Sequence, residues 1–174
     1  ALDVLHTSLK KTRTQKVHVL EPKTLSKLAT VHLHAGDYKS ALAYYDTTYN
    51  LHERTGNEFG IAEVELGRSL VYIEQGKFDL TEQSVNKSLA LAKQSNARIL
   101  EIRGYHRLSS LYELKKDHEN ALAYFKQFKE LEDSLFSQDM QEKLLRDQIR
   151  FETEEKDTEI AALDHELDAL VAAA

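Results

Sequence analysis

Apolar and small side chains recur along this chain of 174 residues at intervals of 40 positions. Five columns keep their size or polarity through three successive copies, which indicates an internal repeat. The columns are Ala29, Ser69 and Ser109; His32, Tyr72 and Tyr112; Ala41, Thr81 and Ala121; Tyr45, Val85 and Phe125; and Leu51, Leu91 and Leu131. Within each copy, apolar positions spaced three and four residues apart predict two helices.

Glycine and asparagine mark the predicted turns. Gly36 and Gly76 lie between the two helices of the first and second copies, because glycine supplies the backbone freedom that a tight reversal needs. Gly56 and Asn96 lie between one copy and the next, and both residue types tolerate the left-handed conformation that ends a helix. We therefore predict a short turn at each of these positions.

No such turn is predicted after the third copy. Phe136 stands where the earlier copies have glycine or asparagine, and it disfavours the left-handed conformation. Neither glycine nor proline follows Gly104. We predict that the last helix continues from about His118 to about Leu170, a rod of ~75 Å.

The spacing also sets the expected division of the chain. Leu5 and Ser8 lie 40 positions before Tyr45 and Thr48, so we expect a fragment that begins halfway through a repeat. We expect the second helix of a truncated repeat and a linker in residues 1–21, and a helical extension that forms a coiled coil in 137–174. The three repeats between them are expected at 22–61, 62–101 and 102–136.

Each copy also fits a known motif. The first has Leu25, Leu28, Ala29, His32, Gly36, Tyr38, Ala41 and Tyr45, and the third has Tyr105, Leu108, Ser109, Tyr112, His118, Ala121 and Phe125. This pattern resembles the tetratricopeptide repeat, although Glu65 and Arg68 of the second copy replace large apolar residues. The resemblance implies an all-α fold, a right-handed superhelix of antiparallel helix pairs. Its concave groove is expected to bind a protein or peptide and to perform no chemistry.

The same resemblance implies that the first helix of each repeat lines the groove. Offsets from the core columns place there Ser26, Thr30, Leu33, Leu66, Leu70, Ile73, Arg103, His106, Arg107, Ser110 and Glu113. Some relatives clamp the C-terminal carboxylate of a chaperone in this groove. Arg103 and Arg107 match one part of that clamp, whereas Ser26, Thr30 and Gly67 do not match the rest.

The predicted rod carries exposed apolar residues of its own. We interpret Met140, Leu144, Leu145 and Ile149 as one stripe, and Ile160, Leu163, Leu167 and Leu170 as another. Thr153 and Lys156 weaken the seam between the two stripes. This interrupted heptad pattern predicts a coiled coil that makes a parallel homodimer. The alternative is a helix that folds back on the array or frays.

A second resemblance concerns the segment from Phe151 to Ile160, with Glu152, Thr153, Glu154, Lys156 and Glu159 between them. It is similar to the helix that follows tetratricopeptide arrays in bacterial histidine kinases and diguanylate cyclases. The resemblance implies a sensory region of a larger signalling protein. It favours the periplasmic side of a membrane-anchored bacterial sensor, with the cytoplasm as the alternative. A free-standing scaffold is the second interpretation.

Composition narrows the possible functions. One proline, six glycines and no alternating strand-like run favour an all-α chain. A net charge of −6 disfavours nucleic-acid binding, which needs a basic face. The absence of cysteine excludes disulfides, thiolate nucleophiles and cysteine metal sites. No apolar run approaches the length of a membrane span, so we expect no membrane contact within these residues.

Candidate chemistry is sparse. His165, Glu166 and Leu167 are similar to the phosphoacceptor box of histidine kinases, so a phosphorelay fragment is a third interpretation, although the proline of that box is missing. His32 and His34 are two residues apart and point in different directions on a helix. We therefore expect neither an enzyme nor a metal or cofactor site.

Overall fold

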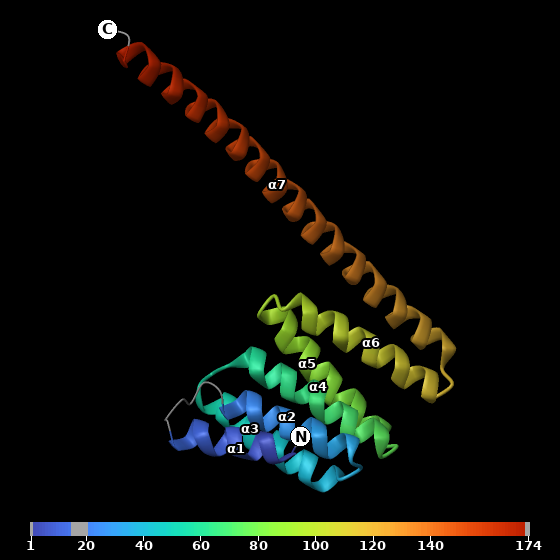
Figure 1. Ribbon diagram of the computed structural model, residues 1–174. Helices are drawn as coiled ribbons and strands as arrows, with labels where there is room; N and C mark the ends of the chain where they lie inside the picture. The colour runs from blue at the N-terminus through green and yellow to red at the C-terminus, as the bar shows by residue number, and fades with distance from the viewer. Residues whose placement is uncertain (1, 15–20, 173–174) are drawn as a thin grey trace. The chain divides into compact units, whose positions relative to one another are not determined.

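The computed structural model describes residues 2–14 and 21–172, with side chains at 3–10, 21–154, 156–157 and 160 (Figure 1). Within these residues it contains seven helices and no strand. The helices are α1 (Leu2–Thr14), α2 (Glu21–His34), α3 (Tyr38–Arg54), α4 (Glu58–Glu74), α5 (Phe78–Gln94), α6 (Arg98–Leu114) and α7 (His118–Ala172). The predicted all-α fold is confirmed. The chain divides into two compact units, residues 1–132 and 133–174.

The turn inside each repeat uses one left-handed residue at the same repeat position. Gly36 and Gly76 have φ of +75° and +69°, as their residue type predicts. The third repeat has Lys116 there, with φ of +59°. The fold therefore imposes this conformation even where a side chain disfavours it.

The turns between repeats also use one left-handed residue each, and no such turn follows the third repeat. Gly56 and Asn96 are left-handed, with φ of +63° and +52°. Phe136 is helical, and α7 continues for 55 residues. The prediction that the last helix does not stop is confirmed.

Side-chain caps begin three of the helices. Asp37, Asn57 and Asp117 each accept a hydrogen bond from the backbone N–H three residues on, at 3.1, 2.9 and 3.2 Å. These bonds satisfy donors that a helix start leaves unpaired. Lys77 and Ala97 occupy the cap position of α5 and α6 without a side-chain hydrogen bond.

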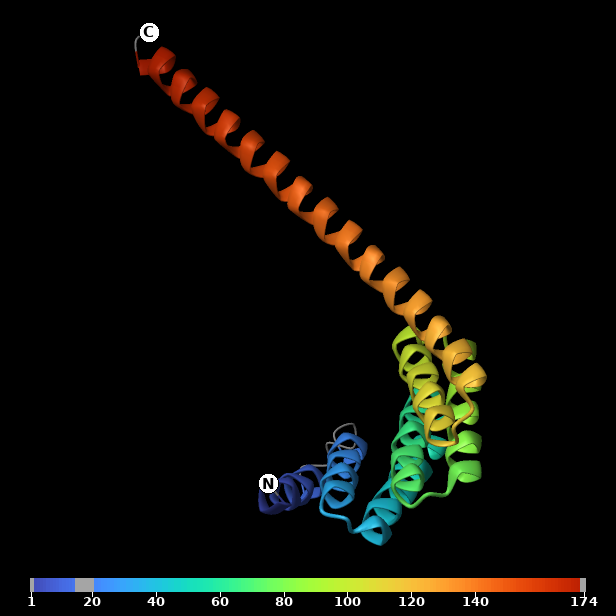
Figure 2. The ribbon, with the colours of Figure 1, turned by 90° about the vertical axis from the view of Figure 1, so that its right-hand side faces the viewer.

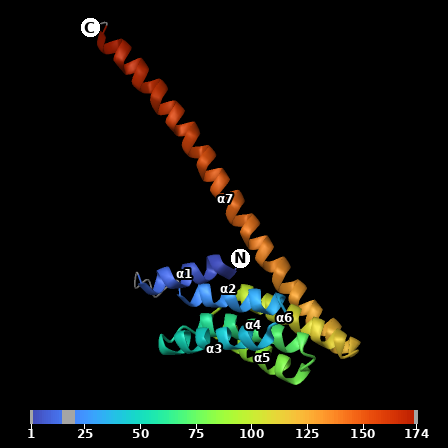
Figure 3. The same ribbon diagram turned by 60° about the horizontal axis from the view of Figure 1, so that its bottom comes forward.

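Helices α2 to α6 and the start of α7 stack as successive antiparallel pairs (Figures 2 and 3). The first helices of the repeats follow one another, since α2 contacts α4 and α4 contacts α6. The small column of Ala41, Thr81 and Ala121 is buried in all three repeats. Small side chains at these positions allow the paired helices to approach closely, and larger apolar residues fill the space around them.

Helix α1 packs as the second helix of a repeat would. Leu5 and Leu9 lie against Leu25 and Leu28 of α2. Tyr45, which lies 40 residues after Leu5, packs in the same way with Val64 and Val71 of α4.

The second repeat replaces an apolar core position with an ion-pair cluster. Glu65 is only 3% exposed, and its Oε1 lies 3.0 Å from both Arg68 Nη1 and Lys87 Nζ. Arg68 also pairs with Asp46 of α3, and both cations lie over the ring of Tyr49. A buried carboxylate is tolerated here because two cations compensate it.

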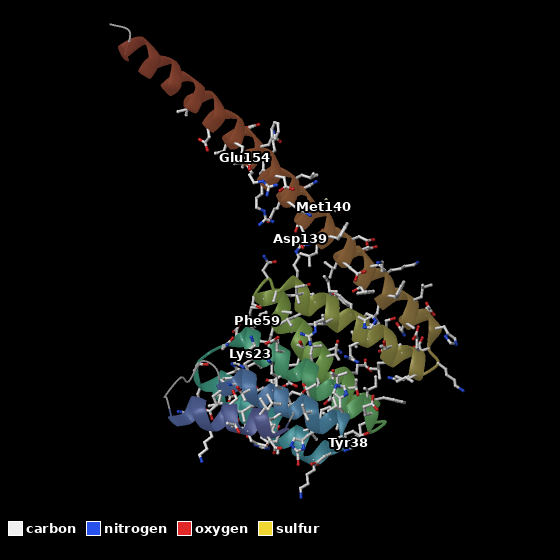
Figure 4. All side chains as sticks on the ribbon, in the orientation of Figure 1. Lys23, Tyr38, Phe59, Asp139, Met140 and Glu154 are labelled. Carbon is white, nitrogen blue, oxygen red and sulfur yellow. The ribbon has the colours of Figure 1, made fainter. Side chains whose placement is uncertain are left out.

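The second unit, residues 133–174, is helical throughout its described part. Met140, Leu144, Leu145, Ile149 and Ile160 are all exposed, between 43% and 62%. Met140 and Glu154 are labelled in Figure 4. The side chains of Leu163, His165, Leu167 and Leu170 lie outside the described residues.

One part of the sequence interpretation is wrong. At 100° per residue, Met140 and Ile149 point in opposite directions on a continuous helix, so they do not share a stripe. Phe136, Met140, Leu144 and Phe151 lie on one side. The other side carries Leu145, Ile149 and Ile160.

Candidate ligand-binding face

Two adjoining hollows lie beside the start of α2, the smaller one facing α4 and the larger one facing the end of α3. The smaller hollow, of about 380 Å³, is lined by Pro22, Lys23, Ser26, Lys27, Thr30, His52 and Glu63. The larger hollow, of about 870 Å³, is lined by Glu21, Pro22, Leu51, His52, Arg54, Thr55 and Asn57. Pro22 and His52 belong to both walls, so one ligand could occupy both hollows.

Cations predominate around the smaller hollow. Lys23 and Lys27 are four residues apart on α2 and therefore share one face (Lys23 is labelled in Figure 4). Within the described part of the chain, neither has a carboxylate at salt-bridge distance. Arg103 of α6 reaches the same place, with its Nη1 3.8 Å from Glu63 Oε1. Three cations thus surround one carboxylate, although the whole chain has a net charge of −6.

Tyr45 packs beneath this face in a gap left by glycine, and its side chain is only 3% exposed. A Cβ at Gly67 would lie 2.4 Å from the Tyr45 ring, so only glycine permits this approach. The phenol oxygen lies 3.3 Å from Thr30 Oγ1. Burial raises the pKa of Tyr45 above its usual value, so the phenol stays neutral and acts as a hydrogen-bonding group.

His52 forms the wall between the two hollows. Its ring lies on Gly60, where a Cβ would come within 2.4 Å of the imidazole. Burial lowers the pKa of His52, and the nearby Glu63 opposes this only in part. The wall is therefore an uncharged aromatic surface at neutral pH.

Arg107 adds a second cation further along α6. It is half-buried, and this burial, with Arg103 one turn away, lowers the pKa of its guanidinium. The charge of Glu74 opposes that shift. The buried Nε of Arg107 has no hydrogen-bond partner among the described residues. A guanidinium nevertheless remains protonated in proteins, so Arg107 is a positive group on this face.

The eleven groove residues predicted from sequence are distributed unevenly. Ser26 and Thr30 line the smaller hollow together with Glu63, and Arg103 forms an ion pair with that carboxylate. Leu33 and Leu66 are buried in the cores and offer little surface to a ligand. Both side chains pack inside the apolar clusters between helices and do not point into the hollows.

The remaining predicted groove residues do not join the hollows. Leu70 and Ile73 are half-buried and pack against the cores. The His106 ring lies 5.0 Å from that of Phe128, and Ser110 Oγ donates a hydrogen bond to the His106 carbonyl oxygen. Glu113 is exposed.

Two comparisons bear on the family. Family models described as tetratricopeptide repeat match residues 20–94 and 102–134. The chain carries tetratricopeptide repeats. Repeats of this kind are protein-interaction modules, so the array is a surface for binding other proteins. A comparison with curated protein sequences finds no match.

A solved structure has the same fold as the tetratricopeptide array. It is the crystal structure of BtubC (BKLC) from P. vanneervenii, with a TM-score of 0.65 and 16% sequence identity. The similarity covers 77% of this chain and 56% of that one, so the chain spans about half of that protein's length. At this identity the likeness concerns the fold alone.

The described residues show neither a metal site nor a membrane-spanning helix. They contain no group of three or more histidine and carboxylate side chains that could hold a metal ion. In the same part of the chain, no helix is both long and apolar enough to cross a bilayer.

Sequence reasoning missed most of the residues that line the hollows, including four charged or aromatic side chains of the smaller hollow. They are Lys23, Lys27, His52 and Glu63. Lys23 and Lys27 could have been found from their positions three residues before Ser26 and Thr30 on the same helix face. Nothing in the sequence indicates His52, because its place depends on how α3 packs against α4.

Proposed function

We propose that the tetratricopeptide array binds a protein or peptide along α2, α4 and α6, and that α7 joins two copies and transmits binding to an output domain. The observation that carries the first part is the pair of hollows with Lys23 and Lys27 left unneutralised. Exposed cations beside concave surface are typical of a binding site for a charged partner.

The exposed apolar side chains of α7 support the second part. Leu145, Ile149 and Ile160 lie on one side of the helix, and the sequence continues this register with Leu163, Leu167 and Leu170. Covering such a seam stabilises an assembly by about 25 cal/mol for each Å² of apolar surface. A second copy presents the same seam, so a parallel homodimer covers it.

The signalling context rests on the segment from Phe151 to Ile160 and its likeness to the helix before bacterial output modules. We place the array in the sensory region of such a protein, with the periplasmic side of the membrane as its expected location. A gene that continues past residue 174 into a membrane span and a catalytic domain would support this. A stop codon there would instead support a free-standing scaffold.

The dimer is tested by sedimentation of the full chain and of a chain truncated after Ser137. We expect the full chain to be a dimer and the truncated chain a folded monomer. Leu145→Glu should dissociate the dimer, whereas Leu144→Glu, on a different side of the helix, should not. A monomeric full chain at high concentration would refute the dimer.

Ligand binding is tested with a library of random short peptides displayed on phage. We expect the full chain to enrich a set of peptides. A chain with Lys23 and Lys27 both changed to glutamate should lose most of that set. If no peptide is enriched, the array does not bind peptides in this way.

A further inference from the structure

We infer that the two hollows select an acidic side chain that lies beside a bulky apolar side chain in the ligand. The inference rests on the proposed peptide binding and names the chemistry that the site accepts. It differs from the clamp for a terminal carboxylate, because the acidic group would lie inside the peptide and next to an apolar contact.

The acidic half of the motif follows from the charges around the smaller hollow. Lys23 and Lys27 face it without a carboxylate partner in the described part of the chain. Glu63 already lies 3.8 Å from Arg103, so it does not neutralise both lysines. A ligand carboxylate would restore the balance of charge, whereas a basic ligand would meet net repulsion.

The wall of the smaller hollow favours a carboxylate over a purely apolar group. The hydroxyl-bearing residues Ser26 and Thr30 line it, and the Tyr45 phenol lies 3.3 Å from Thr30. The Thr30 hydroxyl already donates to the Ser26 carbonyl oxygen at 3.0 Å, so the Ser26 hydroxyl is the group that would donate to the carboxylate and orient it between the lysines. His52 is held neutral by burial and does not add a fourth charge.

The apolar half follows from the larger hollow. Pro22, Leu51 and His52 form its non-polar part, beside the polar residues Glu21, Arg54, Thr55 and Asn57. Its volume of about 870 Å³ is large enough for a leucine or an aromatic side chain. Because Pro22 and His52 border both hollows, the two ligand side chains must be close together along the peptide.

The same phage library tests this inference on the full chain. The peptides are fused through their C-termini, so no free terminal carboxylate is available. We expect the enriched sequences to contain aspartate or glutamate next to leucine, isoleucine or an aromatic residue. Enriched peptides that lack this pair would overturn the inference and leave the proposed peptide binding intact. The absence of any enriched peptide would overturn both.

Affinity measurements on one enriched peptide then locate the contact. Changing its acidic residue to the amide should weaken binding to the full chain about tenfold. Lys27→Glu should weaken binding of the original peptide by a similar factor. The amide peptide should bind this variant with the same affinity as the original peptide does.

Lys39→Glu is the matched control, because Lys39 is an exposed lysine of α3 outside both hollows. It makes the same change of charge in the chain and should leave the affinity unchanged. Circular dichroism of each variant establishes that it is folded. Equal weakening by Lys27→Glu and Lys39→Glu would show a general charge effect and would overturn the inference.

Discussion

At the scale of the residue, the repeat imposes a backbone conformation on whichever side chain stands at a given column. Gly36, Gly76 and Lys116 adopt the same left-handed turn, although only two of them are glycine. Sequence analysis predicts the two glycine turns from residue type. It has no means to predict that Lys116 is left-handed, because the packing of the third repeat dictates this against the local preference.

Lys116→Gly should therefore stabilise the array. A non-glycine residue in the left-handed region costs the folded state on the order of 1–2 kcal/mol, and glycine removes this cost. Glycine also raises the conformational entropy of the unfolded chain, which offsets part of the stabilisation. We expect an increase of about 1 kcal/mol in the free energy of unfolding, measured by urea denaturation. Lys115→Gly, one residue earlier in an ordinary helical conformation, should instead destabilise the array.

A pair of side chains between α5 and α6 gives the array a dependence on alkaline pH. Tyr112 OH donates to Glu82 Oε1 at 2.7 Å, and Lys115 donates to the other oxygen of Glu82 at 3.1 Å. The Glu82 carboxylate raises the pKa of Tyr112 to about 12. The raised pKa means that the neutral phenol is favoured in the folded chain.

The stability supplied by Tyr112 should be fully present below pH 10, the usual pKa of tyrosine, and lost as the pH rises through about 12. Tyr112→Phe lacks this contribution at every pH. The difference in the free energy of unfolding between the two proteins should thus be constant up to pH 10 and shrink above it. A difference that stays constant to pH 12 would contradict the assigned hydrogen bond.

At the scale of the element, helix starts differ in how well their first amides are satisfied. Lys77 precedes α5 as its N-cap residue, with φ of −87° and ψ of +70°, and Asp37 precedes α3 with almost the same backbone, at −84° and +72°. Asp37 caps its helix and Lys77 does not. The capping position is therefore already shaped for a short acidic side chain in the second repeat.

Lys77→Asp should stabilise the array by about 1 kcal/mol, through a new cap and a favourable charge at the helix start. Lys77→Ala removes the same lysine without supplying a cap and is the control. Thermal unfolding of both variants measures the difference. Equal melting temperatures would mean that the aspartate does not cap α5.

Most helices could be predicted from sequence, because periodicity and turn residues agree in the first two repeats and the 40-residue period extends them to the third. The two sides of α7 follow from the apolar pattern only together with a continuous helix, because Met140 and Ile149 are close in sequence but lie 180° apart around it. The hollows were also beyond sequence reasoning. Their shape depends on three helices at once and on a glycine, Gly60, whose missing side chain admits the His52 ring.

At the scale of the whole molecule, charge should control association through α7. Glu152, Glu154 and Asp157 are exposed and lie between the apolar residues Ile149 and Ile160. Glu152 lies on the same side of the helix as Leu145 and Ile149, so in a parallel homodimer it faces its own copy and repels it. The proposed dimer is therefore weakened at low ionic strength and remains adjustable.

Raising the KCl concentration should tighten the dimer by screening this repulsion, with a several-fold fall in the dissociation constant. Sedimentation across a series of salt concentrations measures it. A variant with Glu152 changed to glutamine should bind more tightly at low salt and respond less to added salt. A dimer that weakens as salt rises would contradict this account.

The buried cluster around Glu65 limits how the repeats can be exchanged. Its partners come from the second repeat, as Arg68 and Lys87, and from the first, as Asp46 and Tyr49. A second repeat moved to another place in the array would keep the buried carboxylate and lose the neighbours contributed by the first. These two repeats are thus a matched pair, and an array lengthened by duplication would have to copy them together.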